Sequence, residues 1–228
     1  MNKNIVGNNN FLYCKNQDIK SIEDVIRVKY PKYLTVDNLR ELLSKFGYSQ
    51  ISIYQTVDRI VNKGIYIQVD KDTFLVRDKF LLENKEVEKL VEFAKDKISK
   101  NGFFIPKEYI KEIQKDVDFK EFEINQFTIS NILEENGFKK LFRYKMKNSM
   151  DVIVLVDEKS EYKDIDELAY DILKESYEGN MNERDVYDFL SEVGIYEEIE
   201  DPIYKKMYND MKMNGYISVD DEGKVILK

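Results

Sequence analysis

Residues 53–76 read IYQTVDRIVNKGIYIQVDKDTFLV, and this stretch decides the fold. Ile53, Val57 and Ile60 recur at the spacing of one face of an α-helix. The helical pattern ends at Gly64, a residue suited to the left-handed conformation that often closes a helix. Apolar and polar residues then alternate, as they do in the strands of a β-hairpin. The stretch therefore predicts a helix that runs directly into a hairpin.

The same junction occurs three times along the chain. Gly64, Gly137 and Gly215 each follow a polar residue at the end of a helical pattern and precede an aromatic or β-branched residue. A recurrence of this kind indicates an internal repeat. Upstream of each glycine, apolar periodicity predicts further helices. The predicted order is three helices followed by a hairpin, in three consecutive units.

Capping residues mark where several of these helices begin. Ser21, with Asp24 three residues later, matches a capping box. Thr35 and Ser49 suit the N-caps of the second and third helices, and Pro106 suits the first turn of a helix in the second unit. Within the first unit, buried faces are predicted for the second and third helices at Leu39, Leu42, Leu43 and Phe46, and at Ile53, Val57, Ile60 and Val61.

Three helices followed by a hairpin, repeated three times, resembles the winged-helix superfamily over residues 20–228. The resemblance implies a helix-rich α+β fold of three tandem winged-helix units. The units are residues 1–80, with a mobile start at 1–19, then 81–159 and 160–228. In the third unit, DELAYDILKES and the closing hairpin are similar to the acidic winged-helix modules attached to some bacterial RNA polymerase subunits. The alternative is an unrelated α+β domain with three coincidental helix-to-hairpin junctions.

The composition argues against enzymatic chemistry. The chain contains no histidine, which removes the commonest general acid and base and the usual zinc sites. The single Cys14 excludes an internal disulfide and any two-cysteine redox motif. No glycine-rich phosphate-binding pattern occurs. We therefore predict no catalytic residue, no metal site and no cofactor.

The hydropathy pattern bears on location. No apolar run approaches the roughly 18 residues that a membrane span needs. The first residues, MNKNIVGNNNFLYCKNQ, lack a hydrophobic stretch long enough for a signal peptide. We therefore expect a cytoplasmic protein without a membrane partner.

The net charge of −8 conceals a gradient along the chain. Residues 1–80 carry 13 Lys and Arg against 9 Asp and Glu, a net charge of +4. Residues 81–159 carry 15 against 16, and residues 160–228 carry 8 against 19, a net charge of −11. The parts of the chain are therefore expected to meet different partners.

The third helix of the first unit is the predicted DNA-reading element. A helix-turn-helix unit places this helix in the major groove, where Gln and Arg match the edges of adenine and guanine. The predicted polar face has no acidic residue, and the helix start is suited to phosphate or base contacts. An ordinary solvated face is the alternative. The predicted DNA-contacting residues are Ser49, Gln50, Ser52, Gln55, Thr56, Arg59 and Lys63.

The hairpin of the second unit is a second predicted DNA contact. The segment FKKLFRYKMKN holds five cationic residues within nine positions and no acid among them. A basic wing of this kind suits the phosphate backbone. The alternative is a lysine-rich strand edge that blocks unwanted sheet pairing. The residues predicted to contact phosphates are Lys139, Lys140, Arg143, Lys145 and Lys147.

These patterns predict a regulatory protein that binds double-stranded DNA. Its first two units contact the duplex, and its acidic third unit contacts a protein partner or a second copy of the chain. The expected role is regulation of transcription or of another DNA transaction. The alternative is a protein–protein scaffold, an accessory subunit associated with a polymerase or a chromosome, that does not bind DNA itself. A third interpretation is that the acidic unit mimics DNA.

Overall fold

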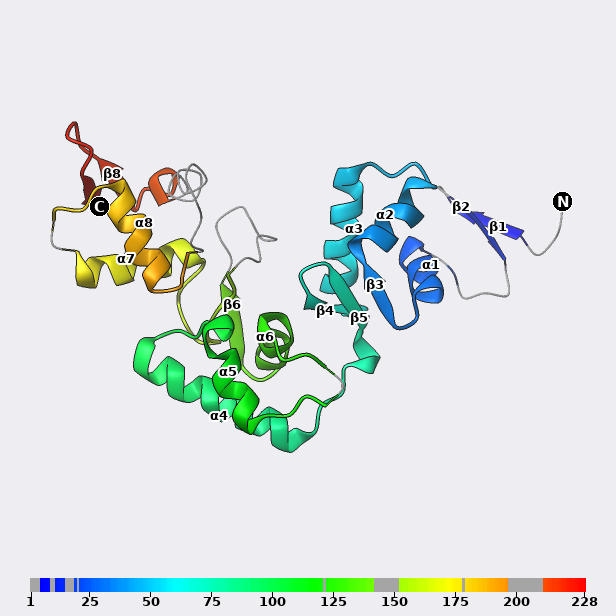
Figure 1. Cartoon of the computed structure of the whole chain (residues 1–228). Helices are drawn as coiled ribbons and strands as arrows, with labels where there is room; N and C mark the ends of the chain where they lie inside the picture. The colour runs from blue at the N-terminus through cyan, green and yellow to red at the C-terminus, as the bar shows by residue number, and fades with distance from the viewer. Residues whose placement is uncertain are drawn as a thin grey trace. The chain divides into compact units, whose positions relative to one another are not determined.

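The computed structural model describes two compact units, Met1–Leu82 and Glu83–Lys228. Both combine α-helices with small antiparallel β-sheets, so the fold belongs to the α+β class (Figure 1). The described residues are 5–8, 11–14, 19, 21–120, 122–141, 152–177, 179–196 and 211–228, with the first two ranges described by their backbone alone.

A short hairpin lies near the N-terminus. Strands β1 (Ile5–Asn8) and β2 (Phe11–Cys14) pair in an antiparallel register. We predicted no regular structure for residues 1–19. Each strand has only four residues, which is too short for alternation to stand out in the sequence.

The rest of the first unit follows the order helix, strand, helix, helix, strand, strand. The three strands form one antiparallel sheet in the order β3-β5-β4. The helices and the β4-β5 hairpin were predicted, but strand β3 was not. The elements are α1 (Ile22–Lys29), β3 (Tyr33–Thr35), α2 (Val36–Ser44), α3 (Gln50–Asn62), β4 (Tyr66–Asp70), β5 (Thr73–Val76) and the short 3-10 helix η1 (Arg77–Lys79).

The predicted N-caps of the three helices in the first unit are confirmed. At the start of α1 the Asp24 backbone N–H donates to the Ser21 hydroxyl, and the Ser21 backbone N–H donates to the Asp24 carboxylate. Thr35 and Ser49 accept backbone N–H groups in the same way at the starts of α2 and α3. Gly64 follows α3 with a φ of +64°, a conformation that a side chain would strain.

Apolar side chains from all three helices and the sheet fill the core of the first unit. Tyr66 is fully buried in this core, and its hydroxyl donates to the backbone carbonyl of Tyr30 at 2.6 Å. The predicted burial of Phe46 is wrong, because this residue lies beyond the end of α2 and is 45% exposed. The buried members of the core include Ile22, Ile26, Leu34, Leu39, Leu42, Leu43, Ile53, Ile60 and Phe74.

Strand β4 lies at one edge of this sheet. Its pairing with β5 is regular from Tyr66 to Gln68 and then shifts register between Gln68 and Asp70. Such a shift places an extra residue on one strand and bends it. The far end of β4 is therefore irregular.

The second compact unit, Glu83–Lys228, contains both the second and the third predicted repeats and continues the alternation of helices and hairpins. Pro106 begins α5, as the sequence predicts. Of the helix predicted to end before Gly215, only residues 211–213 are described. The elements are α4 (Asn84–Asn101), α5 (Pro106–Asp116), α6 (Gln126–Glu134), β6 (Phe138–Leu141), β7 (Val154–Asp157), α7 (Ile165–Ser176), α8 (Glu183–Glu192), β8 (Ile217–Val219) and β9 (Val225–Leu227).

One further feature repeats three times in the structure. The segment between the first two helices of each repeat pairs with, or next to, the second strand of the following hairpin. In the first repeat Leu34 lies opposite Phe74. Isolated antiparallel bridges stand at the matching places of the other two repeats, Phe104 with Leu155 and Asn182 with Lys224. The repeated order is therefore helix, short strand or bridge, helix, helix, hairpin.

The core of the second unit continues across the predicted boundary at 159/160. Ile105, Leu141 and Val154 come from the segment before it and belong to the same buried cluster as Leu168 and Leu190. Residues 83–228 thus form one packed body, although the order of elements repeats within them.

Candidate nucleic-acid interface

The outward face of α3 carries amide and apolar side chains. Ile51 is 72% exposed and Tyr54 is 47% exposed. Gln55 and Asn62 are also exposed, and neither hydrogen-bonds to another described side chain. Asp58, which is half-buried, lies on the same side by helical spacing. This face lies about a quarter of a turn around the helix from the predicted polar face.

Thr56 causes this difference. We predicted it on the exposed face, but it is fully buried. Its hydroxyl donates to the Ser52 backbone carbonyl at 2.8 Å and accepts from the Arg59 guanidinium at 3.1 Å. A threonine whose hydroxyl is satisfied within its own helix packs like a small apolar residue. Thr56 therefore belongs to the buried side of α3. The exposed face is centred on the side of the helix that carries Ile51 and Gln55, and Arg59 lies at its margin.

The start of α3 is polar and open. Ser49 caps the helix, and its hydroxyl lies 3.0 Å from the hydroxyl of the half-buried Ser52. Gln50 is exposed, and the first turn of α3 contains no acidic residue. Exposed backbone N–H groups at a helix start favour an anion such as phosphate.

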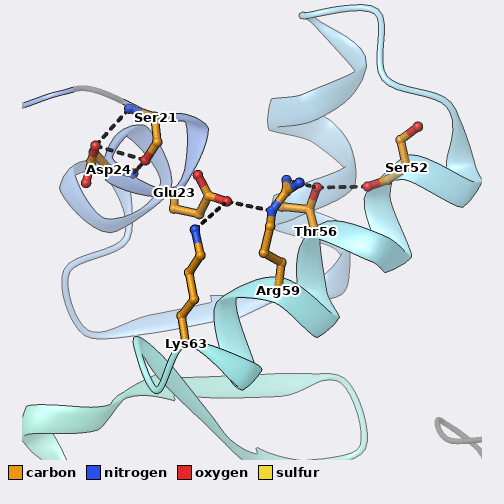
Figure 2. A network of polar contacts seen from close by, with 7 residues as sticks. All are labelled: Ser21, Glu23, Asp24, Ser52, Thr56, Arg59 and Lys63. Atoms are coloured by element: carbon orange, nitrogen blue, oxygen red, sulfur yellow. Dashed lines mark hydrogen bonds and ion pairs between the residues drawn. The ribbon is translucent and has the colours of Figure 1, made fainter.

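An acidic residue from α1 engages the two cations predicted to reach the DNA. Figure 2 shows Arg59 and Lys63 converging on the Glu23 carboxylate. The Arg59 Nε lies 2.5 Å and the Lys63 Nζ 3.4 Å from the same oxygen, Oε1. The Glu23 side chain is only 7% exposed, whereas Arg59 and Lys63 are 45% and 55% exposed. Arg59 is therefore directed toward α1, and Lys63 is held more loosely.

The surroundings of Glu23 favour its charged form. Burial alone would raise the pKa of its carboxyl group. Its own backbone N–H, the Ser21 hydroxyl and the cations Arg59 and Lys63 outweigh burial, so the pKa lies below the ordinary value of 4.5. The charged carboxylate stabilises the folded state above the ordinary carboxyl pKa, and this contribution is lost as the pH falls through the lowered pKa.

Glu23→Gln is expected to reduce the free energy of unfolding at neutral pH by about 1–2 kcal/mol, because it removes charge-assisted hydrogen bonds while the freed cations reach water. The difference from wild type should shrink as the pH falls below 4.5. Urea unfolding at several pH values measures it. Glu41→Gln is the matched control, since Glu41 pairs with Lys45 on an exposed surface and should change stability very little. Equal losses for both variants would contradict the prediction.

The first turn of α7 repeats the arrangement around Glu23. Asp164 caps α7 by accepting the Glu167 backbone N–H at 2.9 Å, as Ser21 caps α1. Asp166, the counterpart of Glu23, is fully buried. Its carboxylate accepts from the Tyr196 hydroxyl at 3.2 Å and from the Asn214 amide at 3.5 Å. Asn214 directly precedes Gly215, just as Lys63 precedes Gly64, so the contact holds equivalent segments together in both repeats.

The two described lysines of the predicted basic wing contact the protein itself. Lys139 donates to the backbone carbonyls of Ser160 and Tyr162. The Lys140 side chain is only 10% exposed, and its ammonium contacts Glu134 and the Asn131 amide oxygen. Arg143, Lys145 and Lys147 lie outside the described residues.

The positive charge of the first unit is smaller in its described helices and sheet than in the whole segment. Residues 21–80 carry 10 Lys and Arg against 8 Asp and Glu, a net charge of +2. The other half of the net +4 belongs to residues 1–20. The tip of the β4-β5 hairpin, Asp70-Lys71-Asp72, contains two acids and one cation. The described helices and sheet of the first unit are thus nearly neutral as a whole.

The described residues also bear on metal binding and membrane insertion. In the part of the chain that the structure describes, no three His, Cys, Asp or Glu side chains are grouped to hold a metal ion. Nor does any described helix have the length and apolar character needed to cross a membrane.

Comparison with known proteins found no matching protein-family model and no matching curated protein.

Proposed function

We propose that this chain is a non-enzymatic regulatory protein of tandem winged-helix units that binds duplex DNA, with helix α3 of the first unit as the base-reading element and the basic segment 143–147 as a phosphate contact. The proposed process is regulation of transcription or of another DNA transaction. The outward face of α3 carries the proposal: Gln55 and Asn62 present exposed amides beside an acid-free, open helix start. Amides on an exposed helix match the donor and acceptor pattern of base edges in the major groove.

The order of elements supports the winged-helix part of the proposal. In the first unit β3 lies between α1 and α2, and β5 pairs with both β3 and β4. Helix α3 then leads directly into the β4-β5 hairpin. A recognition helix followed by a wing is the arrangement that docks a helix-turn-helix unit on DNA. The matching bridges at Phe104 and Asn182 extend the same order to the other two repeats.

In the proposed contact, few cations reach DNA phosphates, and hydrogen bonds to the bases contribute more. Lys63 remains half exposed, and its 3.4 Å contact with Glu23 is weak enough for a phosphate to replace. Arg143, Lys145 and Lys147 keep their proposed role at phosphates. Lys139 and Lys140 instead hold the second hairpin against neighbouring segments, so they do not belong to the proposed phosphate contacts.

A protein–protein scaffold is the second candidate. Ile51 and Tyr54 expose apolar surface on α3, and four of the predicted DNA-contacting cations are engaged by protein groups. Residues 160–228, with a net charge of −11, suit a basic protein partner or a basic surface of a second copy. The same acidic segment serves as the partner-binding unit in the first proposal.

Binding to a labelled random-sequence duplex of about three helical turns separates the two candidates. Wild-type protein is expected to bind near micromolar concentration at low salt, with affinity falling steeply as salt is added. Lys63→Ala should reduce the salt slope by about one phosphate contact. Fluorescence anisotropy at several salt concentrations measures both effects.

The control for this experiment is Lys100→Ala. Lys100 lies on α4 and is 64% exposed, comparable to Lys63. Its removal should leave the salt slope unchanged. If wild-type protein does not bind even at low salt, the scaffold becomes the better account, because non-specific affinity requires no knowledge of the site.

A further inference from the structure

We propose that α3 selects A·T-rich sites by reading the major groove, and that Glu23 withholds Arg59 from guanine. This inference rests on the proposed DNA-binding function and names the class of duplex that the first unit prefers. Its basis is the set of side chains that α3 turns outward and the contacts of those that it turns inward.

Four of the outward residues form a single stripe along α3, and Tyr54 lies beside it. Ile51, Gln55, Asp58 and Asn62 are separated by four, three and four positions, the spacing of one helix face. At a rise of about 1.5 Å per residue, the stripe is about 16 Å long. Neighbouring base pairs are about 3.4 Å apart, so this length faces about five of them.

The amides of this stripe favour adenine. Gln55 and Asn62 are exposed and form no hydrogen bond with another described side chain. A side-chain amide can donate to N7 of adenine and accept from its N6 amino group at the same time. Because neither amide is hydrogen-bonded to a described side chain, contact with a base breaks no side-chain hydrogen bond of these two residues.

Ile51 adds to the preference for A·T, whereas Asp58 only disfavours contact with guanine. Ile51 is 72% exposed at the second position of α3, where an aliphatic side chain matches the methyl group of thymine. Asp58 offers only acceptors while ionised. A carboxylate is unfavourable opposite guanine, whose major-groove edge presents two acceptors, N7 and O6. It can accept from the amino group of adenine or cytosine, so Asp58 disfavours guanine but does not by itself distinguish an A·T pair from a G·C pair.

Arg59 is the only side chain on α3 with the bidentate fork that reads guanine, and its contacts hold it elsewhere. Its Nε lies 2.5 Å from Glu23 Oε1, and its Nη2 donates to the buried Thr56 hydroxyl at 3.1 Å. These contacts fix the guanidinium on the flank of α3, toward α1 (Figure 2). Moving it to a base would leave the 7% exposed carboxylate with Lys63 as the one remaining cation among its described partners.

Three duplexes that share their flanks and differ only in the central base pairs test this inference. One core is A·T, one is G·C, and one is inosine·C, which shows a minor groove like A·T but a major groove with the acceptors of G·C. Wild-type protein is expected to bind the A·T core about tenfold more tightly than the G·C core. The inosine·C core should behave like G·C, because the groove being read is the major one.

Two variants assign the preference to residues. Gln55→Ala should lose most of the A·T preference and keep its affinity for the G·C core. Gln114→Ala removes an exposed glutamine from α5 in the second unit and should change neither. Glu23→Gln should raise affinity for the G·C core severalfold, since it frees Arg59. Circular dichroism on each variant establishes that the fold is retained.

The outcomes separate failure of the inference from failure of the proposed function. Equal binding of the A·T and G·C cores overturns the inference and leaves DNA binding in place. An A·T preference that Gln55→Ala retains, or that inosine·C shares, also overturns it, since the reading then lies outside the outward face of α3. Unchanged G·C affinity of Glu23→Gln overturns the role of Glu23. No binding of wild-type protein to any core at low salt overturns both proposals.

Discussion

Replacing Ile105 by Ala is expected to destabilise residues 83–228 by about 2–5 kcal/mol. Ile105 is 2% exposed and belongs to the buried cluster that contains Leu168 and Leu190. Its Cδ1 lies close to Gly194, where an added Cβ would approach it to 3.2 Å. A cavity at this place would weaken segments on both sides of position 159. Hydrogen exchange on the full chain should show lost protection in α4 to α6 and in α7 and α8 together.

Ile60→Ala supplies the matched control. Ile60 is fully buried in the core of the first unit, so its truncation removes the same atoms from the other compact body. It should lower protection only within residues 21–82. If Ile105→Ala leaves α7 and α8 unchanged, or if either variant weakens both units equally, the division into two packed bodies after Leu82 does not describe how the chain unfolds.

Replacing Tyr66 by Ala is expected to destabilise the first unit by about 3–5 kcal/mol, whereas Tyr66→Phe should cost about 1–2 kcal/mol. The ring is fully buried, and the hydroxyl donates to the Tyr30 carbonyl at 2.6 Å and contacts the Ile26 carbonyl at 3.4 Å. These carbonyls lie in and just after the last turn of α1. The alanine variant loses packing and these bonds together, while the phenylalanine variant loses only the bonds. Urea unfolding of both variants separates the two contributions.

The stability of the first unit is also expected to depend on the ionisation of Tyr66 at alkaline pH. Burial raises the pKa of its hydroxyl to about 12, with a smaller contribution from Tyr30. Because the folded state holds this proton more tightly than the unfolded state, the contribution to stability is complete below the ordinary pKa of 10.0 and is lost as the pH rises through about 12. Comparing wild type with Tyr66→Phe in an ultraviolet titration isolates this residue. A Tyr66 hydroxyl that titrates at its ordinary pKa would contradict the buried hydrogen bonds.

Helices were predictable here because their signals are local. The capping pair at Ser21 and Asp24 and the periodic leucines of α2 depend on residues within one or two turns. Strand β3 has three residues, and its counterparts at Phe104 and Asn182 are single bridges. Elements this short show no alternation, and their pairing depends on contact with a hairpin far along the chain. The boundary at 159/160 illustrates the same limit, since repeated element order does not reveal whether neighbouring repeats share a core.

The candidate interface was less predictable because contacts distant in sequence decide it. Glu23 lies 40 positions from Lys63, and only folding brings it beside α3. Thr56 counted as polar in the sequence, yet its hydroxyl is satisfied within the helix, so the outward face turned toward Ile51 and Tyr54. Lys139 and Lys140 similarly meet carbonyl and carboxylate groups that the sequence does not place near them.

One signal for the buried acids does exist in the sequence. Residues 21–24 read SIED and residues 164–167 read DIDE, a capping residue followed by an isoleucine and two acids in both repeats. Aligning these two stretches pairs Glu23 with Asp166. The first acid after the isoleucine is the buried one in each case, so the repeat itself marks both positions.

The register shift in β4 has a consequence for how molecules of this protein behave at high concentration. A strand at the edge of a sheet presents backbone groups with which a strand of another molecule can pair. Between Gln68 and Asp70 the regular spacing of those groups is interrupted, so an approaching strand meets only a short regular stretch before the pattern fails. Acidic residues at the hairpin tip add repulsion between identical edges. The irregular end of β4 is thereby a poor template for the edge-to-edge association through which sheet proteins aggregate.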